Sequence, residues 1–283
     1  MNGLKRFKSS EAAARQLRRD TIMMIERSKT SHIGSCLSMA DILAVLYRDV
    51  LNLDARDPKW VQRDIYLQSK GHAAAILYAC LARVGYIDPV ELARFCQDGA
   101  SLGGHVTTHG APGVELSVGS LGHALPVGAG WALGMKRKGK TRRVFVVLSD
   151  GECDEGSNWE AALFAGHHGL DNLSAIVDCN GIQSFGSVEE VMRLEPFVQK
   201  WRDFGWQAVE LNGHDHAALR QALECRTEGG KPLCIIARTV KGRGVSSMEN
   251  ALLWHYRSPS KDDADAALIE LGGASCETDL WTR

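Results

Sequence analysis

Short runs of apolar residues alternate along the chain with longer segments in which apolar residues recur every three or four positions. The run 144–148 is wholly apolar and rich in valine, which is typical of a parallel strand buried on both faces. Residues 157–169 carry apolar side chains at helical spacing, and a second apolar run follows at 173–177. These segments predict one strand–helix–strand unit with parallel strands.

The same alternation continues through most of the sequence. The further predicted helices are 10–29, 39–51, 73–84, 121–135, 196–204 and 214–227. The further predicted strands are 65–69, 206–211 and 233–239. This order of elements predicts a three-layer α/β/α fold around a mainly parallel, doubly wound sheet.

Composition restricts the possible partners. The 283 residues are 45% hydrophobic and 24% charged, as in an ordinary soluble globular protein, and the net charge of -1 gives no electrostatic case for nucleic acid or an anionic membrane as partner. The 8 cysteines include no CxxC pair, which argues against a zinc ribbon or a disulfide framework and favours reduced thiols. No apolar run approaches the ~20 residues of a membrane span, so we expect a cytoplasmic protein.

Polar residues follow both strands of the central unit. Asp150 and Gly151 come after the first strand, and Asp178 and Asn180 come after the second. The carboxyl ends of parallel strands face one crevice, where ligands of open α/β sheets bind. The Asp150 carboxylate, the Asn180 amide oxygen and a backbone carbonyl near Ile182 are ligands that Mg²⁺ or Ca²⁺ takes, with phosphate oxygens completing the shell. These turns therefore predict a divalent ion bound to phosphate, with Gly151 allowing a close approach of the backbone.

The spacing of these turns resembles a known signature. SDG followed about 27 residues later by CN is similar to the GDG…NN motif of thiamine-diphosphate enzymes, and ECDEGSNWEAA is similar to its transketolase form. Ser149 and Cys179 depart from the motif, but neither position is a predicted metal ligand. KTSHIG, SKGHA, GVE…GSLG and TVKGRGVSSMENALLWHY resemble further transketolase segments in the same order, with Ile33 and Tyr256 as departures. The resemblance to the transketolase family covers about residues 7–259.

The resemblance implies a set of site residues. The implied catalytic residues, which would contact the sugar or the cofactor and handle protons, are His32, His72, His105 and His255. The implied cofactor contacts are His72, Gly119, Ser120, Leu121, Gly151, Glu155, Asn180, Lys241 and His255. The metal ligands remain Asp150, Asn180 and Ile182. Glu155 has an alternative explanation, because an acidic residue in the first turn of a helix is favoured by the helix dipole.

The resemblance also implies an incomplete active site. A whole transketolase subunit is more than twice this length, because a second domain binds the aminopyrimidine of thiamine and supplies an activating glutamate. We therefore expect the N-terminal, diphosphate-binding subunit of a split transketolase, with thiamine diphosphate and Mg²⁺ or Ca²⁺ as cofactors. Residues 1–259 would form this domain and 260–283 a polar C-terminal tail. The implied enzyme is a heterotetramer with a companion C-terminal subunit that transfers a two-carbon ketol unit from a ketose (phosphate) to an aldose.

Three alternatives remain open. A 2-oxoacid dehydrogenase α-type subunit or a deoxyxylulose-phosphate-synthase-like half would share the metal motif, but neither explains KTSHIG and SKGHA together. A non-catalytic paralogue could bind the cofactor or a partner without turnover. A nicotinamide-binding Rossmann domain is the weakest alternative, because no GxGxxG opens the first strand–helix turn.

Overall fold

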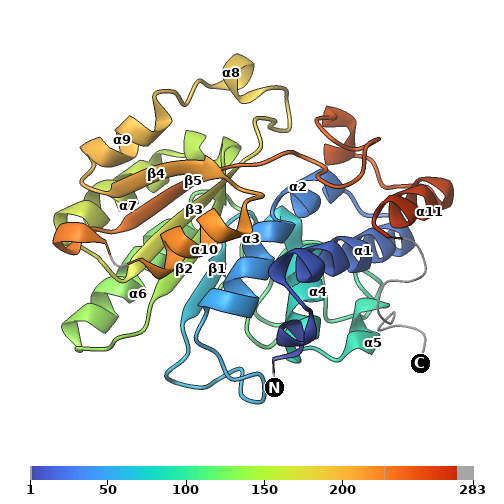
Figure 1. The fold of residues 1–283 in the computed structure, drawn as a ribbon, viewed down its shortest axis with the longest axis horizontal. Coiled ribbons are helices and arrows are strands. Elements are labelled where there is room, and N and C mark those ends of the chain that lie inside the picture. The colour runs from blue at the N-terminus through green and yellow to red at the C-terminus, as the bar shows by residue number, and fades with distance from the viewer. Residues whose placement is uncertain (1, 226, 273–283) are drawn as a thin grey trace.

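The strands form one parallel sheet at the centre of the molecule (Figure 1). The structure is a computed structural model, and it describes residues 2–225 and 227–272. The strands in these ranges are β1 (Ile65–Gln68), β2 (Val144–Ser149), β3 (Leu173–Cys179), β4 (Gln207–Asn212) and β5 (Leu233–Arg238). They pair in the order β1-β2-β3-β5-β4, and each neighbouring pair is parallel. The predicted parallel sheet is confirmed.

Helices cover both faces of this sheet (Figure 1). The helices are α1 (Ser10–Ser28), α2 (Ile33–Ser38), α3 (Ala40–Val45), α4 (Ala74–Val84), α5 (Pro89–Leu92), α6 (Ala124–Arg137), α7 (Gly156–His167), α8 (Val188–Val191), α9 (Phe197–Asp203), α10 (His216–Glu224) and α11 (Lys261–Glu270). On one face, α1 to α4 and α10 share a core with Phe145 and Val147. On the other face, α6, α7 and α9 pack with Val144, Val146 and Leu148. The three-layer α/β/α arrangement is therefore also confirmed.

β2 has an apolar sequence because its side chains point alternately into two cores. Every residue of β2 is buried, because successive side chains of a strand point to opposite faces and both faces are covered. β4 lies at an edge of the sheet, and all of its residues except Ala208 are partly or largely exposed. Its polar residues Gln207, Glu210 and Asn212 fit this exposure.

The predicted helices begin and end close to helices of the structure, but the short helices α2, α5 and α8 were not predicted and one predicted helix is divided. α1 starts after Ser9, whose hydroxyl accepts a hydrogen bond from the Ala12 backbone N–H at 3.3 Å. α2 was not predicted, because its six residues are all buried and show no polar face. The predicted helix 39–51 is α3 followed by a wider helical turn at Leu46–Val50.

The last described helix lies on α1. α11 begins with a capping box between Ser260 and Asp263, and its Ala264 and Ala267 are buried in the core that α1 shares. The proposed boundary at residue 259 stays a prediction, and residues 273–283 of the polar tail lie outside the described residues. In the part of the chain that the structure describes, no helix has the length and apolarity to cross a membrane, and the seven cysteines there are free thiols.

Candidate active site

A cavity of about 230 Å³ opens beyond the carboxyl ends of β1, β2 and β3. This is where ligands bind in open parallel sheets. Its lining residues are His32, Ser35, His72, His105, Gly119, Leu121, Ser149, Asp150, Gly151, Glu152, Asn180, Ile182, Gln183, Ser184 and His255. Most predicted site residues are therefore brought together. Ser120 and Glu155 are exposed and do not line the cavity, and Lys241 lies directly behind the lining, where its Nζ contacts Ile182 and His255.

Four histidine rings gather at one end of this cavity. The ring centroid of His32 lies 5.2 Å from that of His72, 6.0 Å from that of His105 and 4.9 Å from that of His255. The rings come from four separate segments: the residue before α2, the turn after β1, the loop before α6 and the segment before α11. The backbone N–H of His32 donates to the His255 carbonyl at 3.0 Å, which ties two of these segments together. The sequence prediction that these four histidines share one crevice is therefore consistent with their geometry.

Gly71 allows the segments that carry His72 and His105 to approach each other closely. A Cβ at this position would lie 2.7 Å from the carbonyl oxygen of Val118, which is shorter than real Cβ contacts. The Val106 backbone N–H donates to the Gly71 carbonyl at 3.2 Å, and Val118 N–H donates to the Val106 carbonyl at 3.0 Å. Gly71 thus lets the loop that carries His105 pack against the turn that carries His72.

Burial and nearby positive charges lower the pKa values of His32, His72 and His255. Burial lowers the pKa of His32 to about 4, with further lowering by His105 and Lys241. Burial, followed by the charge of Lys241, lowers the pKa of His255 to about 3. The pKa of His72 is also well below its usual value, first because of burial and then because of Lys70. Neutral imidazoles can both donate and accept hydrogen bonds.

The tautomer of one ring follows from its partner. Nδ1 of His255 lies 3.0 Å from the Nζ of Lys241, an ammonium group that can only donate, so the ring proton sits on Nε2. Burial, and then the charge of Lys70, lower the pKa of Lys241 to about 8. Lys241 Nζ also donates to the Ile182 carbonyl at 3.0 Å. Among the described residues, the buried Nδ1 of His32 has no hydrogen-bond partner, which leaves it available to a ligand.

The predicted metal ligands converge beside the histidines. Asp150 is 2% exposed, and its carboxylate accepts hydrogen bonds from the Gly181 N–H at 2.6 Å and the Gly151 N–H at 2.8 Å. Burial raises the pKa of this carboxyl to about 6, and the charge of Asp178 contributes. Asn180 Oδ1 accepts from the Ile182 N–H at 3.2 Å. Asp150 is therefore a buried carboxylate whose direct partners are neutral N–H groups.

A buried ion pair that the sequence analysis missed lies under the cavity. Lys70 and Asp178 have fully buried side chains and contact each other directly. Lys70 Nζ also donates to the Ser35 carbonyl at 3.0 Å, while Asp178 accepts from the Ser38 hydroxyl at 2.6 Å and from the Thr239 hydroxyl. Burial opposes ionisation of Asp178, but Lys70 and the hydrogen bonds from Ser38 and Thr239 together hold the pKa of this carboxyl below its usual value. Lys70 lies in the SKGHA motif, and Asp178 is in β3 directly before the CN motif, which was the available signal.

Comparison with known proteins decides the family. Residues 9–277 match the family described as transketolase, thiamine diphosphate binding domain. The chain belongs to the transketolase family. One subunit of an apulose-4-phosphate transketolase from Actinobacillus succinogenes is 42% identical over 262 residues, which are 92% of this chain and 95% of that protein. A 6-deoxy-6-sulfo-D-fructose transketolase subunit from a Clostridium species is 36% identical over 260 residues, which are 91% of this chain and 94% of that protein.

Solved transketolase structures share the fold. The structure of the Campylobacter jejuni transketolase matches 97% of this chain and 44% of its own with a TM-score of 0.90 and 28% identity. The Leishmania mexicana transketolase matches 97% of this chain and 42% of its own with a TM-score of 0.88 and 30% identity. This transketolase-family chain therefore spans about two fifths of those chains.

The glutamate that lines the cavity of this transketolase-family chain is Glu152, whereas Glu155 is not among the lining residues. Glu152 is fully buried and accepts hydrogen bonds from the Ser69 hydroxyl, from the Gly122 N–H at 2.9 Å and from the Ser149 N–H at 3.3 Å. Burial raises the pKa of its carboxyl. Glu155 directly precedes α7 and is exposed. Glu152 thus ties the glycine loop before α6 to the end of β2, whereas a cofactor contact of Glu155 stays a prediction.

The cavity chemistry fits a cation bound to an anionic group. The predicted metal ligands in its lining are the Asp150 carboxylate, the Asn180 amide oxygen and the Ile182 carbonyl, which suit Mg²⁺ better than zinc. In the described residues, no three His, Cys, Asp or Glu side chains group as a metal site, so ligand oxygens would have to complete the shell. The Ile182 carbonyl already accepts from Lys241, but a carbonyl oxygen has a second lone pair. A diphosphate with its metal ion would supply both the cation and the remaining ligand oxygens.

Proposed function

We propose that this chain is the N-terminal, diphosphate-binding subunit of a two-component transketolase. The enzyme would transfer a two-carbon ketol unit from a ketose, usually phosphorylated, to an aldose acceptor. The observation that carries this proposal is that four histidine rings and the buried carboxylate of Asp150 line one cavity at the ends of the parallel strands. Relatives named as transketolase subunits, which this chain matches over nearly their full length, support the division into two chains.

The cofactor would be held by its diphosphate end. Asp150, the Asn180 amide oxygen and the Ile182 carbonyl would bind Mg²⁺ together with diphosphate oxygens. Lys241 and His255 would contact the diphosphate, and the backbone at 119–121 would lie along the thiamine. When bound, thiamine diphosphate supplies the nucleophile that takes up the two-carbon unit. The raised pKa of Asp150 supports this role, because a divalent ion would supply the opposite charge that its carboxylate lacks among its direct partners.

The histidines would bind the sugar and move its protons. His32, His72 and His105 surround one end of the cavity, where a neutral imidazole can accept a hydroxyl proton or donate to a carbonyl oxygen. The unpartnered Nδ1 of His32 can accept a hydrogen bond from a substrate hydroxyl. His255 is held by Lys241 with its proton on Nε2, so it would act as a donor. The names of the two relatives suggest testing ketoses that carry an anionic group, either phosphate or sulfonate.

A companion subunit would cover the open side of the cavity. Phe185 is 84% exposed and directly follows cavity-lining Gln183 and Ser184. Leu163 and Phe164 on α7 are exposed as well. Exposed apolar side chains of this size are typical of protein–protein interfaces, and permanently assembled subunits bury about 2,000–5,000 Å². We propose that the companion supplies the aminopyrimidine pocket and completes a heterotetramer.

The proposal is tested by reconstitution. The chain is purified alone and co-expressed with the product of a neighbouring reading frame, and molecular mass is measured by light scattering alongside ketol transfer from phosphorylated and sulfonated ketoses. We expect a larger complex and activity only after co-expression. Activity with a 2-oxo acid and no ketose would instead favour another class of thiamine-diphosphate enzyme. Cofactor binding without turnover in the complex would favour a non-catalytic paralogue.

A further inference from the structure

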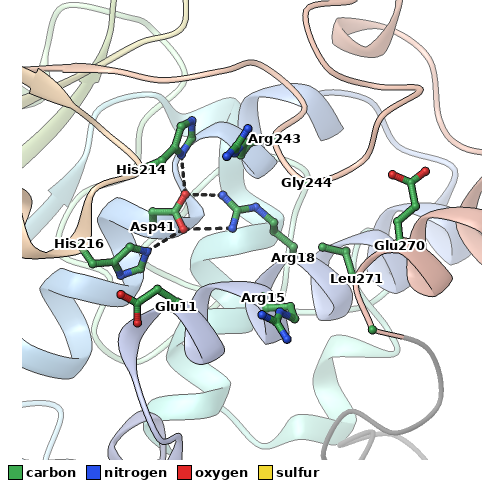
Figure 2. Close-up of a pocket in the computed structure, with 11 residues that line it drawn as sticks. Glu11, Arg15, Arg18, Asp41, His214, His216, Arg243, Gly244, Glu270 and Leu271 are labelled. Atoms are coloured by element: carbon green, nitrogen blue, oxygen red, sulfur yellow. Dashed lines mark hydrogen bonds and ion pairs between the residues drawn. The ribbon is translucent and has the colours of Figure 1, made fainter.

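A second cluster of buried polar side chains lies outside the candidate active site (Figure 2). At its centre is Asp41, at the start of α3 and 5% exposed. Its carboxylate accepts hydrogen bonds from Arg18 Nη1 at 3.1 Å and Nη2 at 2.5 Å, from His214 Nδ1 at 2.6 Å and from His216 Nε2 at 2.9 Å. We call these four residues the Asp41 network. None of them lines the cavity of the candidate active site.

The partners of His214 fix its tautomer and its orientation. The backbone N–H of Val240 donates to His214 Nε2 at 2.9 Å, so this nitrogen carries no proton. The proton must therefore sit on Nδ1, where it is donated to Asp41. A ring that bonds through both nitrogens to separate elements cannot rotate without losing one bond. The Asp41 network thus holds the His214 ring, and the ring holds the Val240 amide.

Val240 lies between two residues that reach the active site. The hydroxyl of Thr239 donates to Asp178, the partner of Lys70. The Nζ of Lys241 donates to the Ile182 carbonyl and to His255. The His214 bond therefore fixes the backbone at the point from which Lys241 enters the candidate site.

We propose that His214 is a positioning residue, which holds the Val240 amide so that the Lys241 ammonium stays against Ile182 and His255. Its effect on the cofactor rests on the proposed function, in which Lys241 contacts the diphosphate. The Asp41 network supplies the rigid support, because Arg18 and His216 occupy the remaining positions around the Asp41 carboxylate. The placement of Lys241 itself can be tested without assuming that function.

A simpler explanation is that the Asp41 network stabilises the fold, but its geometry favours a role in positioning His214. Removing the charges of a buried ion pair from water offsets much of their attraction, so such a pair is weak support for stability. The network also leaves the buried Nδ1 of His216 without a partner among the described residues. It borders a cavity of about 500 Å³ as well, so it is not tightly packed on that side. The Asp41 network does, however, hold the His214 ring in one orientation.

Two isosteric variants separate the two bonds of His214. In His214→Asn the amide nitrogen lies near the position of Nδ1 and keeps the bond to Asp41, but nothing reaches Val240. In His214→Gln the amide oxygen lies near the position of Nε2 and still accepts from Val240. Both variants are uncharged and each loses one hydrogen bond, so their melting temperatures are expected to be similar.

The decisive readouts are hydrogen exchange of the Val240 amide in the full chain and the affinity for thiamine diphosphate with Mg²⁺, measured by calorimetry with the companion subunit. We expect the Asn variant to exchange faster and to bind about ten-fold more weakly, as one lost hydrogen bond implies, while the Gln variant stays close to wild type. Equal losses in both variants that follow their melting temperatures would overturn the proposal. If wild type fails to bind the cofactor, the proposed function is wrong, but the exchange comparison still decides the role of His214.

A measurement on the unmodified protein keeps the inference testable if the Asn variant does not fold. Long-range proton–nitrogen NMR spectra distinguish the two tautomers of a histidine ring. We expect the neutral ring of His214 with its proton on Nδ1. A ring protonated on Nε2 could not accept from Val240 and would overturn the inference.

Discussion

Replacing Asp150 with Asn is expected to stabilise the ligand-free protein near neutral pH while abolishing its response to Mg²⁺ and thiamine diphosphate. The Asp150 carboxyl is 2% exposed, and burial raises its pKa from 3.8 to about 6. Between pH 3.8 and about 6, Asp150 is therefore protonated in the folded protein but ionised in the unfolded chain. Stability that is present below pH 3.8 is thus lost as the pH rises through about 6.

The size of the effect follows from two opposing contributions. A shift of about two pKa units makes the buried charge unfavourable by about 3 kcal/mol at neutral pH. Asn removes that charge, but its NH₂ group faces one of the backbone N–H groups of Gly151 and Gly181, which costs about 1–3 kcal/mol. The expected net gain at about pH 7.5 is about 1 kcal/mol, or a melting temperature about 2–4 °C higher. At about pH 4 the wild-type carboxyl is mostly protonated, so the same variant should be less stable than wild type.

Thermal and urea unfolding at both pH values, with and without Mg²⁺ and thiamine diphosphate, measure this sign change. Asp154→Asn is the matched control, because Asp154 is an exposed carboxylate of the same turn. We expect the ligands to raise the melting temperature of wild type and of the control, but not of Asp150→Asn. A variant that is destabilised equally at both pH values, or that keeps the ligand-induced stabilisation, would refute the assignment of Asp150.

Further predictions concern the histidines and the buried ion pair. His72→Ala and His105→Ala should lower turnover of the assembled enzyme far more than stability, and a variant that melts many degrees lower with unchanged specific activity would mark a structural residue. Because the folded-state pKa of His32 is about 4, the unfolded chain takes up a proton that the folded protein does not, so stability should fall as the pH drops from 6.5 to 4. In urea unfolding, His32→Gln should flatten this dependence, and an unchanged slope would contradict the burial of His32. Lys70→Met should destabilise the protein by about 3–5 kcal/mol because it leaves Asp178 buried without its partner, and Lys70→Met with Asp178→Leu should recover much of this loss in the same assay.

The strands and the histidine cluster could be predicted because their signals are local. The run 144–148 is apolar since both faces of β2 are covered, and such a pattern needs no knowledge of distant residues. His32, His72 and His255 each lie in a short motif that resembles a known family. α2 could not be predicted in this way, because its formation depends on burial by the surrounding helices rather than on its own periodicity.

The contacts that organise the site could not be predicted, because they join distant parts of the chain. Lys70 and Asp178 are 108 residues apart, and Asp41 and His214 are 173 residues apart. A charged residue is more often exposed than paired in the core, so neither pair can be recognised in one sequence. The choice between Glu152 and Glu155 has the same cause, since Glu152 faces inward to accept hydrogen bonds from Ser69 and Gly122, which are distant in the sequence.

We propose that this chain forms an active transketolase only together with a second subunit. The most direct test of this proposal is a titration of a fixed amount of this chain with the companion subunit, in the presence of Mg²⁺, thiamine diphosphate, a ketose phosphate and an aldose. We expect no ketol transfer from either chain alone, a rise with added companion until the two are equimolar, and no activity with Asp150→Asn at any ratio. Full activity of the isolated chain, or none from the complex with any ketose, would contradict the account.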